Sequence, residues 1–117
     1  QDFGRVILNL LTNAFYAVTE KKDLQNIVGE IYEPTVTIAT KKESDKITIT
    51  VTDNGNGMPQ EVIDKVFQPF FTTKPTGKGT GLGLSMSYDI VTKGHNGELK
   101  VTSVENEGTT FSIIILN

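Results

Sequence analysis

ITITVTDNGNG, residues 47–57, joins an alternating strand pattern to a tight turn. Ile47, Ile49 and Val51 alternate with threonines, which is typical of a strand with one buried face. Asp53 has the same parity as Val51, so its carboxylate is expected on the buried side of that strand. Because an unpaired buried charge is very costly, we infer that the Asp53 carboxylate serves a partner or a ligand.

The turn after this strand suits a flat ligand. Gly55 and Gly57 lack side chains beside the carboxylate, so a ligand can approach the backbone there. A carboxylate accepts hydrogen bonds and therefore suits an exocyclic amine such as that of adenine. Asp-Asn-Gly also closes hairpins through an Asx-turn, which is a purely structural role. These residues alone leave both interpretations open.

On the N-terminal side, residues 2–20 carry apolar side chains at a spacing near four, which predicts a long, mostly buried helix. Asn9 and Asn13 are four residues apart and share a face of that helix. A carboxamide oxygen is an acceptable ligand for Mg²⁺, which makes Asn13 a candidate metal ligand; helix caps or surface amides are the plainer alternative. Residues 21–34 mix polar and apolar side chains, and we expect a loop there.

The flanking patterns predict the remaining elements. Val36 and Ile38 mark one half-buried strand and Ile47, Ile49 and Val51 the next, with a turn at residues 42–45 between them. Two more strands are predicted at Leu99–Val101 and Thr109–Ile115, and short helices from Pro59 to Val66 and from Leu82 to Val91. This order favours an α/β fold in which helices pack on one face of a single mixed, mainly antiparallel sheet.

GKGTGLGLS, residues 77–85, is a glycine-rich tract that leads into a predicted helix. Free backbone N–H groups at a helix N-terminus favour an anion such as a phosphate. The tract is not a P-loop, because Thr72 stands where the first glycine belongs and Gly79 follows Lys78. It also lacks the last glycine of the dinucleotide fingerprint. P-loop enzymes and dehydrogenases are therefore disfavoured.

Two further segments accompany these motifs. VFQPFFTTK, residues 66–74, places aromatic side chains beside the glycine-rich tract, where they can hinge a lid or simply fill the core. Gly108-Thr109 opens the last strand and puts a hydroxyl on the buried side, where Asp53 also points.

Taken in order, five motifs resemble those of the GHKL ATPases, and most closely those of the histidine kinase branch. The resemblance runs through RVILNLLTNA (5–14), DNGNGMP (53–59), VFQPFFTTK (66–74), GKGTGLGLS (77–85) and EGTTF (107–111). It implies a Bergerat-type two-layer sandwich whose sheet is covered on one face by three helices. It also implies a flexible lid over ATP, formed by residues 71–80.

The resemblance assigns a role to each matching residue. Asn13 would coordinate Mg²⁺ with help from Asn9, these two being the catalytic pair, and Asp53 would bind the adenine amine near Gly55, Gly57 and Thr109. Backbone contacts to the phosphates would come from Gly79, Thr80, Gly81, Leu82 and Gly83, with Lys74 and Lys78 as further phosphate contacts. Hydrolytic relatives carry Glu where this chain has Asn9, and Asn is not a general base, so phosphoryl transfer is favoured over hydrolysis.

The chain departs from the family pattern in two places. Phe15-Tyr16-Ala17 replaces a Lys-Tyr pair found in some kinases, and His95 lies in a turn that does not match the phosphoacceptor motif. We therefore expect residues 1–117 to be a catalytic and ATP-binding domain without its dimerisation and phosphoacceptor segment. The partners implied are that segment, which carries the acceptor histidine, and a downstream response regulator.

The composition of the chain limits which partners and functions it can have. The net charge is −3 without a basic stripe, which argues against nucleic acid. No run approaches the ~20 apolar residues of a membrane span, so we expect no direct membrane contact and a cytoplasmic location. A degenerate ATP-binding regulatory module, a GHKL protein serine kinase and a hydrolytic GHKL ATPase are the alternatives to a histidine kinase.

Overall fold

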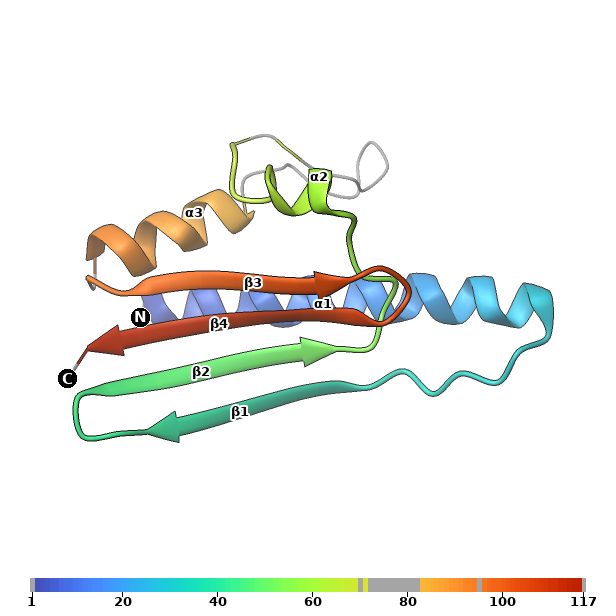
Figure 1. Ribbon diagram of the computed structural model, residues 1–117, viewed down its shortest axis with the longest axis horizontal. Coiled ribbons are helices and arrows are strands. Elements are labelled where there is room, and N and C mark those ends of the chain that lie inside the picture. Colours follow the sequence, from blue (N-terminus) through green and yellow to red (C-terminus); the bar gives the residue numbers. More distant parts are fainter. Residues whose placement is uncertain (1, 70, 72–82, 95, 117) are drawn as a thin grey trace.

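A computed structural model describes residues 2–69, 71, 83–94 and 96–116 and shows four strands arranged as one sheet, with helices behind and beside it (Figure 1). The helices are α1 (Asp2–Val28), α2 (Gln60–Ile63) and α3 (Gly83–Asp89), which continues as the π-helix η1 (Ile90–Gly94). The strands are β1 (Val36–Lys42), β2 (Lys46–Asp53), β3 (Glu98–Val104) and β4 (Gly108–Leu116).

The strands lie in the order β1-β2-β4-β3, and each neighbouring pair is antiparallel. The predicted two-layer α/β fold is therefore confirmed, with a sheet that is antiparallel throughout its described strands rather than mixed. Val51 lies opposite Phe111, which in turn lies opposite Val101, so this row across the sheet is apolar. The rows with buried apolar side chains face α1.

The core lies between the sheet and α1. Val6, Leu10 and Ala14 are buried at helical spacing on α1 and pack with Val51, Phe111 and Ile113 from the sheet. Val91 of η1 joins the same cluster, so the α3–η1 segment packs beside α1 on the same face. Burial of each of the larger side chains in this cluster stabilises the fold by about 1.5–3 kcal/mol.

Helix α1 continues eight residues beyond the predicted end at residue 20, so the prediction of a loop over 21–34 was wrong for residues 21–28. The helix ends at Val28, and the φ of 75° at Gly29 permits the closing turn. There the Gly29 N–H donates to the Asn26 carbonyl (3.3 Å) and the Glu30 N–H to that of Gln25 (3.0 Å), a Schellman ending. In Figure 1 the C-terminal end of α1 extends past the ends of the strands.

The smaller elements follow the prediction with shifted ends. Helix α2 stops at Ile63 rather than Val66, and the next residues form turns. Helix α3 is described from Gly83, and its predicted start at Leu82 lies outside the described residues. Most of the predicted lid lies outside the described residues. Among the helices described here, none combines the length and apolar character needed to cross a membrane.

Candidate functional site

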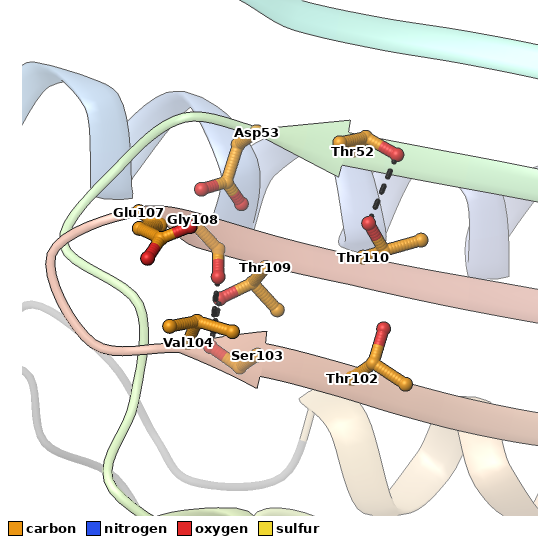
Figure 2. Close-up of a pocket in the computed structure, with 9 residues that line it drawn as sticks. All are labelled: Thr52, Asp53, Thr102, Ser103, Val104, Glu107, Gly108, Thr109 and Thr110. Carbon is orange, nitrogen blue, oxygen red and sulfur yellow. Dashed lines mark hydrogen bonds between the residues drawn. The ribbon is translucent and has the colours of Figure 1, made fainter.

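Asp53 ends β2 and is buried, with 6% of its surface exposed. It lies opposite Thr109 of β4, which is 7% exposed and in turn lies opposite Ser103 of β3. Figure 2 shows the three side chains gathered at one end of the sheet. The predicted orientation of Asp53, on the same face as Val51, is confirmed. The pocket at this end is lined by Thr52, Asp53, Thr102, Ser103, Val104, Glu107, Gly108, Thr109 and Thr110.

The Asp53 carboxylate is held by its own turn and by the next strand. The Gly55 N–H donates to Asp53 Oδ1 at 2.8 Å, and the backbone N–H of Thr109 also stabilises the carboxylate. Burial raises the pKa of Asp53 above its ordinary value, while these N–H groups and the charge of Lys21 act in the opposite direction. The carboxylate is therefore a desolvated acceptor that keeps capacity for donors beyond these two.

Ser103 belongs to this site although the motifs did not point to it. Its hydroxyl accepts the Met58 N–H at 2.8 Å, donates to the Gly108 carbonyl at 3.0 Å and lies 2.8 Å from Thr109 Oγ1. It thereby links the turn after β2 to the start of β4. Only the register of β3 against β4 brings Ser103 to Thr109, and that register is not readable from a local motif.

The glycines of the turn make room for the protein itself. A β-carbon on Gly55 would lie 2.8 Å from the Ala17 side chain, so the turn packs directly on α1. Gly57 has a φ of 70°, and a β-carbon there would overlap the Val104 carbonyl. Both glycines allow the turn after Asp53 to lie between α1 and the β3–β4 hairpin.

One face of α1 runs beneath the whole site, carrying Asn9, Asn13, Ala17 and Lys21 four residues apart. Asn9 contacts α3: its Nδ2 donates to Ser87 Oγ at 3.2 Å, and its side chain lies against Gly83. Ala17 and Lys21 contact the turn after Asp53. Asn13 thus lies between the start of α3 and the Asp53 turn, where a ligand spanning the two would pass it.

The side chains on this face of α1 fit a Mg²⁺ ion only if a bound ligand supplies further oxygen atoms. Among the described residues no group of three His, Cys, Asp or Glu side chains could hold a metal ion. Magnesium is commonly bound by one or two protein oxygens together with phosphate oxygens and water. Amide oxygens of Asn13 and Asn9 suit that arrangement, so the ion would bind with the nucleotide.

Several predicted phosphate contacts lie outside the described residues. These are Lys74, Lys78, Gly79, Thr80, Gly81 and Leu82, and the same holds for His95. Gly83 is the one member of that group with a described position, at the first residue of α3. The structure therefore places the described site residues in two groups along α1, with Gly83 against Asn9 in one and Asp53, Gly55, Gly57 and Thr109 in the other.

The raised pKa of Asp53 predicts a pH dependence of stability without nucleotide. The folded state binds this proton more tightly than the unfolded state, so the stabilising effect is complete below the ordinary pKa of 3.8 and is lost as pH rises through the folded value. Relative to Asp53→Asn, the wild-type free energy of unfolding should therefore increase as pH falls from about 7 to about 4. Urea unfolding of both proteins measures it, and a difference that does not change with pH would contradict it.

Comparison with known proteins identifies the family. The model of the histidine kinase-, DNA gyrase B- and HSP90-like ATPases matches residues 1–117, so the chain belongs to that family. Within it, the chain resembles the catalytic domains of sensor histidine kinases. It is 36% identical over 110 residues to the sensor histidine kinase ZraS of Salmonella typhi, covering 93% of this chain and 20% of that protein.

Other similar proteins are also sensor or histidine kinases. Sensor kinase CckA of Brucella abortus is 49% identical over 73 residues, or 62% of this chain and 8% of that protein. The catalytic domain of histidine kinase ThkA superposes with a TM-score of 0.73 at 32% identity, covering 95% of this chain and 64% of that one. Mycobacterial sensor histidine kinase MprB superposes with a TM-score of 0.73 at 27% sequence identity, covering 97% of this chain and 68% of that one. The chain spans a fifth or less of the curated relatives named here.

Proposed function

We propose that this domain binds Mg·ATP and transfers the γ-phosphoryl group to a histidine on a separate dimerisation and phosphoacceptor domain. The buried Asp53 carboxylate carries the proposal, because it is a desolvated acceptor at the end of β2, on the face of the sheet that α1 covers. Such a group suits the amine of adenine, and the α1 face leads from it toward the start of α3. A nucleotide placed along that face would have its base at Asp53 and its phosphates near Asn13.

Asn9 supports transfer rather than hydrolysis. Its carboxamide donates to Ser87 and lies against Gly83, so it ties α1 to α3. A carboxamide cannot take a proton from water as a carboxylate does. The bound Mg²⁺ would neutralise charge on the phosphates, and the residues of this chain would bind and orient the nucleotide for an incoming histidine.

The alternatives make different demands on the same residues. A degenerate regulatory module does not need Asp53, whose burial raises its pKa and so disfavours the charged carboxylate. A hydrolytic ATPase needs a base where Asn9 stands. A protein serine kinase of the same family stays as the second candidate, and the acceptor residue distinguishes it. We propose that this domain acts in the cytoplasm and that a response regulator acts downstream of it.

The metal assignment is tested by Asn13→Ala. If the Asn13 oxygen ligates Mg²⁺ beside the phosphates, the variant should lose the part of ATP affinity that depends on Mg²⁺ while it stays folded. Calorimetric titrations with ATP, with and without Mg²⁺, measure this for the wild type and the variant. Asn26→Ala, an exposed amide on the same helix, is the matched control. A variant that keeps the full Mg²⁺ response would remove Asn13 from the metal site.

A further inference from the structure

Lys21 lies at the far end of the α1 face and contacts both sides of the Asp53 site. Its Nζ donates to the Asn106 carbonyl at 2.9 Å and reaches the Gly55 carbonyl at 3.4 Å. Gly55 supplies the N–H that holds Asp53 Oδ1, and Asn106 belongs to the hairpin that leads into Thr109. One ammonium group thus joins the two backbone segments that hold the carboxylate.

A second contact ties the chain after α1 to the same place. The Lys21 Nζ lies 5.1 Å from the centre of the Tyr32 ring, within the range of a cation–π contact. The Tyr32 hydroxyl donates toward Asn54, with its Oη 3.0 Å from the carbonyl oxygen and 2.9 Å from Oδ1. Tyr32 therefore connects Lys21 to the residue that directly follows Asp53.

Asn54 is held by the segment around Tyr32 through several further bonds. Its Nδ2 donates to the Glu33 carbonyl at 2.9 Å, its Oδ1 accepts the Thr35 N–H at 2.9 Å, and its own N–H donates to the Thr35 carbonyl at 3.2 Å. These bonds fix the backbone between Asp53 and Gly55 from the side opposite to the β3–β4 hairpin.

We propose that Lys21 and Tyr32 form a clamp that positions the Asp53 carboxylate for the amino group of adenine. The inference rests on the proposed function, because it concerns the same Asp53 site and adds the determinants of base specificity. Both residues act through Asp53 and its backbone donors, so they are positioning residues. The clamp comes from residues 21–35, which lie between the recognisable motifs, and its purpose is selectivity for a purine that bears this amine.

The test compares two nucleotides that differ in that amine alone. ATP and purine riboside triphosphate, which has hydrogen in place of the amino group, are titrated calorimetrically with Mg²⁺ into the wild type, Lys21→Met and Tyr32→Phe. The wild type should bind ATP more tightly than the analogue. Lys21→Met should weaken ATP binding ~3- to 10-fold, about the net value of one ordinary hydrogen bond, and leave the analogue unchanged. Tyr32→Phe keeps the ring and should show a smaller loss in the same direction.

Two further variants separate positioning from general stability. Lys21→Arg keeps the charge and should restore most of the preference for ATP, whereas Lys22→Met, at an exposed neighbour, should bind both nucleotides like the wild type. Equal weakening of ATP and analogue in Lys21→Met, or no weakening in either, would overturn the clamp while leaving the proposed function intact. A wild type that fails to bind Mg·ATP would overturn the proposed function itself.

Discussion

Asp53→Ala should weaken ATP binding by about 1.5–3 kcal/mol, roughly ten- to a hundred-fold, while the domain stays folded. The variant removes the acceptor that we assign to the adenine amine from a site where water cannot easily replace it, because Asp53 is buried opposite Thr109. Calorimetric titration of Mg·ATP into both proteins measures the loss. The folded state is checked by thermal unfolding, in which the variant should be no less cooperative than the wild type.

The control for this variant is Asp45→Ala. Asp45 lies exposed in the turn between β1 and β2, far along the strand from the pocket, and its removal changes net charge by the same amount. Its ATP affinity should match that of the wild type. If Asp53→Ala also binds ATP with wild-type affinity and is folded, the adenine site lies elsewhere in the domain.

Gly108→Ala should destabilise the domain severely. Gly108 has a φ of 140°, which an alanine adopts only with strain, and a β-carbon there would overlap the Asp53 carbonyl oxygen. Backbone strain alone costs about 1–3 kcal/mol, and relief of the overlap must move β4 away from β2 where Asp53 pairs with Thr109. Urea unfolding should show this loss in stability, and the folded fraction should bind ATP poorly.

Gly94→Ala provides the comparison. Gly94 ends η1, and a β-carbon there would meet no heavy atom within 4 Å. An alanine at such a position should leave the free energy of unfolding unchanged within about 0.5 kcal/mol. Equal stability of the two variants would mean that the close approach of β4 to the end of β2 is not required.

The central residues of the site were predictable from sequence because their positions follow from local geometry. Parity along β2 places Asp53 on the buried face, and the helical repeat places Asn9 and Asn13 on one face of α1. Each conclusion needs only the residue repeat of a single strand or helix. The packing of the Asp53 turn onto Ala17 required contact between distant segments, and sequence patterns do not report such contacts.

The end of α1 shows a different limit. Residues 21–28 mix polar and apolar side chains, yet Lys21 is held at the Asn106 and Gly55 carbonyls and Gly29 provides a cap. Tertiary contacts of that kind override weak local preference. Ser103 and Tyr32 were not found from the sequence for a related reason. Each contacts partners at least five residues away in the sequence, and only the fold brings those partners close.

The central claim is phosphoryl transfer from ATP bound at this site to a histidine on another domain. The direct measurement supplies radiolabelled ATP to this domain alone, to the dimerisation segment of its own kinase alone, and to both together, followed by acid treatment that strips phosphohistidine and spares phosphoserine. We expect slow, acid-labile labelling of the segment only when both are present, slow because unlinked domains lack the effective concentration of a tether. Acid-stable label on the partner, or rapid phosphate release by this domain alone, would contradict the account.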